Sequence, residues 1–184
     1  MFADLPVLVL DSLYGTLEHA VETATGPLGL LIIAAYSFLI AFLLPLPSEI
    51  VLAPASQMNL GLSYNVTLVV IMVVSGAGKA LGSVFAFHIG QEAKQSGPVI
   101  RFLRRSRFDV VEWSEARTVQ LAQKYGYIGL AMALSVPFFP DTLSIYAFTV
   151  LEEDYYRFAA ATFAGSVGRL VVTVVAIGGA FAVF

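Results

Sequence analysis

Apolar residues fall into four long stretches, at 28–44, 66–87, 127–151 and 158–184. A bilayer core about 30 Å thick needs roughly 20 apolar residues in a helix. The stretches 66–87 and 158–184 reach that length, and each contains a single charged residue, Lys79 in the first and Arg169 in the second. We therefore expect two full membrane-spanning helices.

Prolines interrupt the other two stretches. One break carries Pro45 and Pro47, the other Pro137 and Pro140. Proline removes a backbone donor and pushes the preceding residue out of helical geometry. The apolar run 50–60 that follows the first break covers only about 16 Å as a helix. Each break is therefore predicted to be the tip of a re-entrant hairpin, with two ordinary kinked spans as the alternative.

Composition supports a membrane protein. Apolar residues make up 58% of the 184-residue chain and charged residues 12%, against about 25% charged in an ordinary soluble domain. A net charge of −3 leaves no basic surface for nucleic acid. The chain has no cysteine, and no catalytic dyad, metal cluster or cofactor motif can be assembled. We expect an all-α integral membrane protein that is not an enzyme.

Basic residues concentrate in the segment 91–125, which holds seven of the ten Lys and Arg residues. Such an excess marks the cytoplasmic side, so this segment is predicted to be a cytoplasmic linker helix of a multi-pass plasma-membrane protein. The hairpins then enter from opposite faces. Residues 1–25 carry four acids and no Lys or Arg, and we expect an interfacial amphipathic segment there. The rest forms one membrane domain, with repeat one at 26–90 and repeat two at 126–184.

The two halves repeat the same charge order. Glu49 at the first break precedes Lys79 by 30 positions, and Asp141 at the second precedes Arg169 by 28. Because the hairpins enter from opposite faces, this predicts an inverted repeat, the arrangement with which many transporters build a midplane site.

A site for a phosphate-like anion is expected where the hairpin tips meet. Ser48 is expected to cap the helical arm that begins at Glu49, and helix starts present free N–H groups that favour anions. Lys79 and Arg169 lie too deep to reach water easily, and buried charges of this kind normally face a partner or a cavity. Protonation of Glu49 or Asp141 would then couple to anion binding. The alternative is that Glu49–Lys79 and Asp141–Arg169 are purely structural ion pairs.

Glycines cluster next to both basic residues. In membrane helices they more often allow close packing than contact a ligand. Their predicted role is to let the hairpins approach the spans. The glycines concerned are Gly76, Gly78, Gly82, Gly165 and Gly168.

The motifs Leu44–Glu49, Gly78–Ser83 with His88–Gly90, and Lys124–Gly126 together resemble the DedA family, also called the VTT-domain family. The resemblance covers roughly residues 26–180. It implies two re-entrant hairpins that meet at the membrane centre, and a role in moving lipids. It places the acid of the first hairpin at Glu49. Many members carry arginines around the second proline motif; this chain has none between Ala133 and Tyr146, as in a divergent subgroup.

These observations lead to one main functional hypothesis. The protein is expected to be a transporter or flippase for an anionic, phosphate-bearing lipid, either polyprenyl phosphate or phospholipid. Its expected partners are membrane lipids. Coupling to a proton or sodium gradient and assembly into a homo-oligomer are left open. The alternatives are a small-solute or ion exporter and a membrane scaffold that transports nothing.

Overall fold

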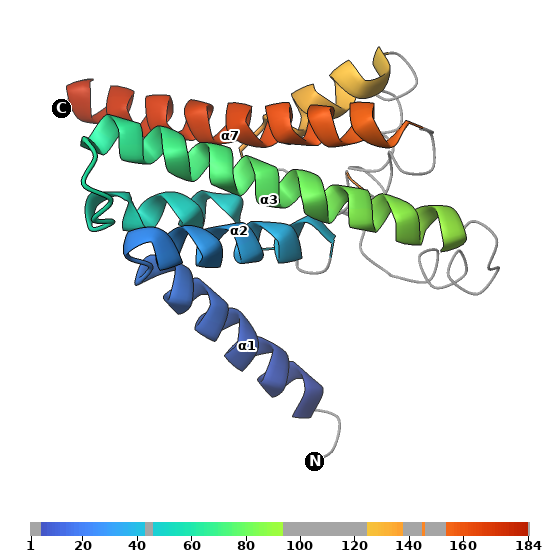
Figure 1. The fold of residues 1–184 in the computed structure, drawn as a ribbon, viewed down its shortest axis with the longest axis horizontal. Helices are drawn as coiled ribbons and strands as arrows, with labels where there is room; N and C mark the ends of the chain where they lie inside the picture. Colours follow the sequence, from blue (N-terminus) through green and yellow to red (C-terminus); the bar gives the residue numbers. More distant parts are fainter. Residues whose placement is uncertain (1–4, 43–45, 94–124, 138–144, 146–153, 184) are drawn as a thin grey trace.

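The computed structural model describes residues 5–42, 46–93, 125–137, 145 and 154–183. Every regular element in these ranges is helical, as the apolar stretches predicted (Figure 1). The elements are α1 (Leu5–Glu22), α2 (Gly26–Phe42), the 3-10 helix η1 (Ser48–Ser56), α3 (Tyr64–Ala93), a helix at Tyr125–Leu134, and α7 (Tyr155–Val183).

The helices α3 and α7 form the long axis of the molecule and lie side by side in opposite directions (Figure 1). Each contains a segment long and apolar enough to cross a membrane, Tyr64–Ile89 in α3 and Tyr155–Gly178 in α7. These are the two stretches predicted as spans. The α3 helix continues to Ala93, so its last three residues belong to what was predicted as the linker; residues 94–124 lie outside the described part.

The first half of the chain places α2 and η1 against α3. The 17 residues of α2 cover about 25 Å. Its direction is parallel to α3, because Ala34 of α2 faces Gly78 of α3, and Phe38, one turn later, faces Gly82. The chain returns through η1, which lies beside both α2 and α3.

The segment after the first proline break differs from the α-helical arm that was predicted. It is a nine-residue 3-10 helix that ends at Ser56, before Leu60. Pro54 lies inside it, and proline has no N–H with which to make an α-helical hydrogen bond. At about 2 Å per residue η1 is about 18 Å long, so the change of helix type keeps the length close to that expected for the arm.

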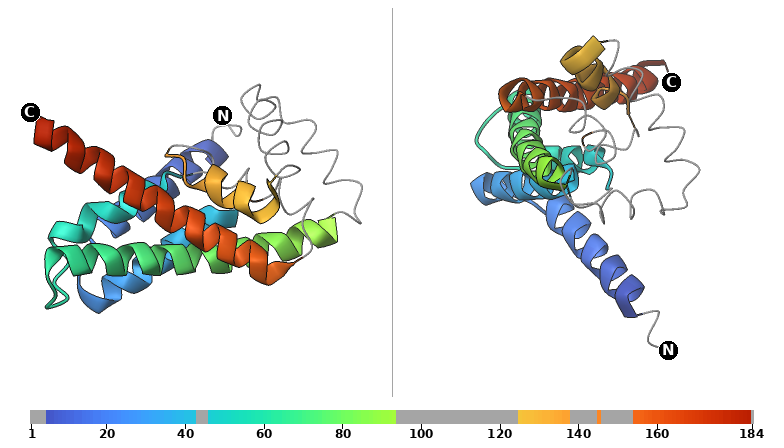
Figure 2. Two further views of the ribbon diagram at one scale, coloured as in Figure 1. Left: turned by 90° about the horizontal axis from the view of Figure 1, so that it is seen from above. Right: turned by 90° about the vertical axis from the view of Figure 1, so that its right-hand side faces the viewer.

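The helix Tyr125–Leu134 packs on the first half of α7 (Figure 2). This helix runs parallel to α7, as α2 does to α3, because Ala131 faces Gly165 and Ser135 faces Gly168. The helices α2 and Tyr125–Leu134 share a further feature. Gly26 and Gly126, at their starts, have φ values of 60° and 53°, a conformation that favours glycine.

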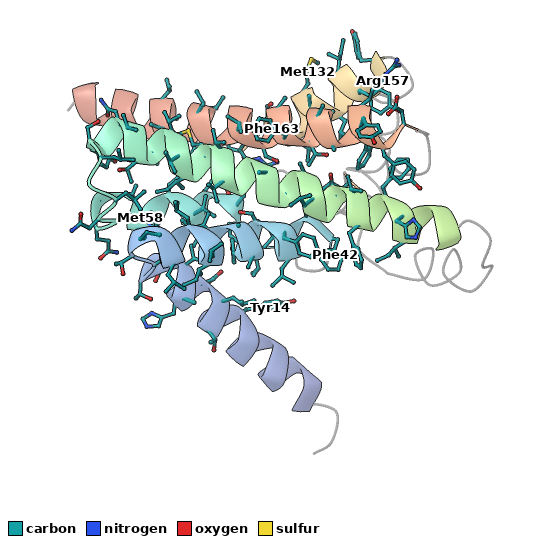
Figure 3. The ribbon with its side chains drawn as sticks, in the orientation of Figure 1. Tyr14, Phe42, Met58, Met132, Arg157 and Phe163 are labelled. Carbon is teal, nitrogen blue, oxygen red and sulfur yellow. The ribbon has the colours of Figure 1, made fainter. Side chains whose placement is uncertain are left out.

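Glycines of the long helices lie against the backbone of the shorter ones. A Cβ at Gly78 would lie 2.5 Å from the Ala34 carbonyl oxygen, and one at Gly165 would lie 2.6 Å from the Ala131 carbonyl oxygen. Gly82 contacts the Phe38 carbonyl in the same way. Gly76 instead faces Phe163 and Val167 of α7, and Figure 3 shows Phe163 where α7 meets α3.

The substitution Gly78→Ala should destabilise the protein. Its Cβ would meet backbone, which cannot rotate away, so α2 and α3 must separate, at a cost of about 1–3 kcal/mol. The matched control is Gly178→Ala on α7, where a Cβ meets nothing within 4 Å and alanine gains up to about 1 kcal/mol in helix propensity. Thermal unfolding in detergent measures both. Equal stability of the two variants would contradict this packing.

Two apolar clusters form the core. The first joins the end of α1, α2, η1, the start of α3 and Leu170 of α7. The second joins Ala41 of α2, the end of α3, the helix Tyr125–Leu134 and the start of α7. The N-terminal part of α1 leaves the bundle and points away from it (Figures 1 and 2). Its last turns are anchored by buried Val21 and by a hydrogen bond of 2.8 Å from Gln57 Nε2 to the Glu22 carbonyl.

Candidate functional site

The inner face of α3 becomes polar between the two apolar clusters. Met72 belongs to the first cluster and Ala86 to the second. Between them, Ser75, Lys79 and Ser83 follow one another at intervals of four residues, and all three are buried. Residues at this spacing lie on one face of a helix, so α3 presents a buried polar row where its core-facing positions would otherwise be apolar.

Lys79 points into the space between α2 and α7. On α3, Gly78 and Gly82 face α2, whereas Gly76 faces α7. At 100° per residue, Lys79 falls in the sector between these two directions. Its side chain is only 2% exposed. A lysine at this depth in a membrane helix is costly unless it faces a partner or a cavity.

A matching row lies on α7. Thr162, Ser166 and Arg169 are buried and lie in the sector between the helix Tyr125–Leu134 and α3. Thr162 donates a hydrogen bond of 3.0 Å to the Phe158 carbonyl. Each of the two long helices thus directs hydroxyl groups and one cation toward the same interior.

Arg169 connects residues of both halves of the chain. Its Nε donates to the Leu134 carbonyl at 2.8 Å, and its Nη1 donates to Ser48 Oγ at 3.4 Å. Leu134 is the last residue of its helix, where carbonyl groups have no partner within the helix. The Ser48 hydroxyl in turn lies 3.5 Å from Glu49 Oε2 and donates to it. Arg169, 2% exposed, therefore joins the end of one short helix to the start of another.

Ser48 does not act as the helix cap that was predicted. The N-cap residue of η1 is Pro47, and no side-chain hydrogen bond caps this helix. Ser48 is the first residue of η1 instead, and its hydroxyl lies between Arg169 and Glu49. The residue is in the expected place, but its hydroxyl bonds other side chains rather than the N–H groups of the helix start.

Lys79 and Arg169 lie at different depths. Gly76 packs against Phe163 and Val167, which fixes the register of the two antiparallel helices. Lys79 is three residues beyond this contact on α3, and Arg169 is four residues beyond the midpoint of Phe163 and Val167 in the opposite direction. With 1.5 Å of rise per residue, the two backbone positions are separated by on the order of 10 Å along the axis. The interior therefore offers two cations at successive depths.

A comparison with known families decides what kind of protein this is. The family model for the VTT domain matches residues 46–178. The chain belongs to the VTT-domain family. This domain is the DedA family domain, whose members are membrane proteins. No curated protein and no solved structure matches the chain.

The VTT match contains most of the polar interior. It begins at Leu46, within the first proline break, and includes η1, α3 and α7 as far as Gly178. Lys79, Ser48, Glu49 and Arg169 all lie within it, whereas α1 and α2 precede it. The resemblance to this family that the sequence motifs indicated is confirmed.

Several predicted site residues lie outside the described residues: Pro45, Pro140 and Asp141. The expected pairing of Asp141 with Arg169 therefore stays a prediction, as does that of Glu49 with Lys79. Pro137 lies in the turn that follows the helix Tyr125–Leu134. In the described part of the chain, no group of three or more His, Asp or Glu could hold a metal ion.

Two contributors to the site were not found from the sequence. The Leu134 carbonyl is a backbone group and leaves no signal in residue type. Ser37 of α2 shares a buried hydrogen bond of 2.8 Å with Ser75 of α3. The sequence did contain an indication of this bond, because a serine inside the apolar stretch 28–44 needs a hydrogen-bond partner when it is buried.

Proposed function

We propose that this VTT-domain protein moves an anionic, phosphate-bearing lipid, a polyprenyl phosphate or a phospholipid, between membrane leaflets. The observation that carries the proposal is the buried guanidinium of Arg169, which contacts Leu134 and Ser48 in the interior. Arginine offers five N–H donors in a planar fork that matches phosphate oxygens. A phosphate that reaches this group would offer it charged acceptors in addition to the neutral Leu134 carbonyl and Ser48 hydroxyl.

The proposed architecture is a pair of inverted repeats, each a re-entrant hairpin followed by a spanning helix. Four parallels support it. In each half a short helix has a glycine with positive φ among its first two residues, runs parallel to the long helix, and packs on its glycines. In each half a buried cation also directly follows one of these glycines, in Gly78-Lys79 and in Gly168-Arg169.

The two depths of Lys79 and Arg169 suit a lipid headgroup that crosses in steps. An isolated anion in the bilayer centre is strongly disfavoured, but a cation on either side of the centre would shorten the distance over which the phosphate is uncompensated. The lipid tail would remain in the surrounding hydrocarbon. Glu49 would repel the phosphate when ionised, so its protonation would favour binding and provide a link to a proton gradient.

The proposal also covers the class of the protein, its membrane and its source of energy. The protein would be a transporter and not an enzyme, a multi-pass protein of the plasma membrane with the segment 91–125 in the cytoplasm. A proton or sodium gradient would supply the energy. Assembly into a homo-oligomer stays open.

A flux experiment tests the proposal. Sealed vesicles containing the protein receive a headgroup-labelled anionic phospholipid and, in a parallel sample, trapped inorganic phosphate. We expect faster lipid movement without phosphate release, and at least about tenfold slower movement for Lys79→Ala, because one charge-assisted hydrogen bond is worth ~1.5–3 kcal/mol. Release of phosphate without lipid movement would indicate a small-solute exporter. Neither flux would indicate a scaffold.

A further inference from the structure

We propose that Tyr36 of α2 is a positioning residue that sets the orientation of Ser48 and Glu49 for the anion site. This inference rests on the proposed function for the role of that site, but its structural basis is independent. The Tyr36 hydroxyl donates a hydrogen bond of 2.9 Å to the Pro47 carbonyl. The side chain is 1% exposed, and it belongs to the same apolar cluster as Val51 and Ala55 of η1.

The bonded carbonyl controls the residue that follows it. Pro47 is extended, with φ −64° and ψ 130°, and lies outside η1 as its N-cap residue. The Pro47 carbonyl and the Ser48 N–H belong to one planar peptide unit. A hydrogen bond that fixes the carbonyl therefore also fixes the plane from which Ser48 begins.

The contacts of Ser48 are long enough to depend on this orientation. Its hydroxyl lies 3.4 Å from Arg169 Nη1 and 3.5 Å from Glu49 Oε2, at the outer limit for hydrogen bonds. A shift of a few tenths of an ångström would break or strengthen them. No side chain caps the start of η1. The Tyr36 hydroxyl instead holds the backbone of this turn as a donor to the Pro47 carbonyl.

Charged groups surround this end of η1 on several elements. Glu18 of α1 and Glu49 of η1 both interact electrostatically with Tyr36. Arg169 approaches from α7 through Ser48, and Lys79 is the buried cation of α3, which packs against η1. The balance of these charges at Glu49 depends on where the Ser48 and Glu49 side chains point, and this follows from the plane of the Pro47–Ser48 peptide, whose carbonyl Tyr36 bonds.

The test compares Tyr36→Phe with Tyr127→Phe. Each removes one hydroxyl and keeps its ring. Tyr127 OH accepts a hydrogen bond of 3.0 Å from the Asp154 N–H, away from η1, so it is a matched control for lost stability. The readout is labelling of Glu49 by dicyclohexylcarbodiimide, which reacts with protonated carboxyl groups. Labelling is carried out at a series of pH values and measured by peptide mass spectrometry. Exposed Glu22 is the internal reference, and Glu49→Gln confirms the labelled site.

We expect the midpoint of the labelling profile to move by about half to one pH unit in Tyr36→Phe, the size that loss of the hydrogen bond from Ser48 to the Glu49 carboxylate produces. Tyr127→Phe should leave it unchanged. Tyr36→4-aminophenylalanine restores a donor at the same place, so it should fold and recover the wild-type midpoint. An unchanged midpoint in Tyr36→Phe, an equal shift in Tyr127→Phe, or no recovery with the amino variant would overturn the proposal. The labelling assay needs no substrate. Absence of lipid movement in vesicles would therefore refute the proposed function but not the positioning role of Tyr36.

Discussion

Replacing Arg169 by alanine should reduce affinity for a phosphate-bearing lipid at least about tenfold, the largest effect expected of any single substitution. A hydrogen bond to a charged group contributes ~1.5–3 kcal/mol, and 1.4 kcal/mol corresponds to a factor of ten. The Leu134 carbonyl would also lose its 2.8 Å donor, and a buried acceptor left without a partner costs about 1–3 kcal/mol. Lipid binding by fluorescence quenching and thermal unfolding measure the two effects.

The same helix offers a control. The Arg157 side chain is 73% exposed and pairs with Asp154 at 3.3 Å; Figure 3 shows it at the start of α7. An exposed pair of this kind is worth about 0–1 kcal/mol, so Arg157→Ala should bind lipid as the wild type does. If both arginine variants lose affinity equally, the effect would be one of total charge rather than of the buried guanidinium.

Replacing both carboxyl groups by amides, with Glu49→Gln and Asp141→Asn, should abolish the pH dependence of lipid binding. A phosphate that takes the place of a carboxylate beside Lys79 or Arg169 favours protonation of that carboxyl group, so binding is linked to proton uptake. By linkage, wild-type affinity should rise as pH falls. The double amide variant carries no proton to exchange at these positions and should bind with nearly constant affinity.

Titrations between pH 5 and pH 8 decide this point with a phosphodiester lipid, whose phosphate does not change its charge in that range, unlike a phosphate monoester. Glu22→Gln at the end of α1 is the control for a lost carboxylate. The double variant must still bind, because both cations remain. Persistent pH dependence in that variant would exclude Glu49 and Asp141 as the coupling groups and leave passive movement through the same interior.

The sequence predicted the long helices well, because 20 or more consecutive apolar residues have few other structures available in a membrane. It also located Lys79 and Arg169 as buried cations, since their distance from both ends of each stretch follows directly from helical rise. Both conclusions depend on local properties of the chain, which a sequence records.

The details of the site depend on contacts between distant segments, and there the sequence was less informative. The charge order predicted Asp141 as the partner of Arg169, and that pairing stays a prediction because Asp141 lies outside the described residues. The hydrogen bonds from Arg169 to a carbonyl and a hydroxyl were not predicted. Ser48 matched the pattern of a helix cap, but Pro47 is the N-cap residue of a 3-10 helix that contains Pro54. Tyr36 gave no signal, because a tyrosine in an apolar stretch is ordinary until its hydroxyl is seen to meet Pro47.

The most direct test of the central claim compares a phosphate-bearing lipid with its neutral counterpart in the same vesicles. Labelled polyprenyl phosphate and the corresponding polyprenol are followed from one leaflet to the other, with wild-type protein and with the Lys79→Ala/Arg169→Ala double variant. We expect wild-type protein to accelerate the phosphate at least about tenfold more than the alcohol, and this preference to disappear in the double variant. Equal acceleration of both lipids, or a preference that survives loss of both cations, would contradict the central claim.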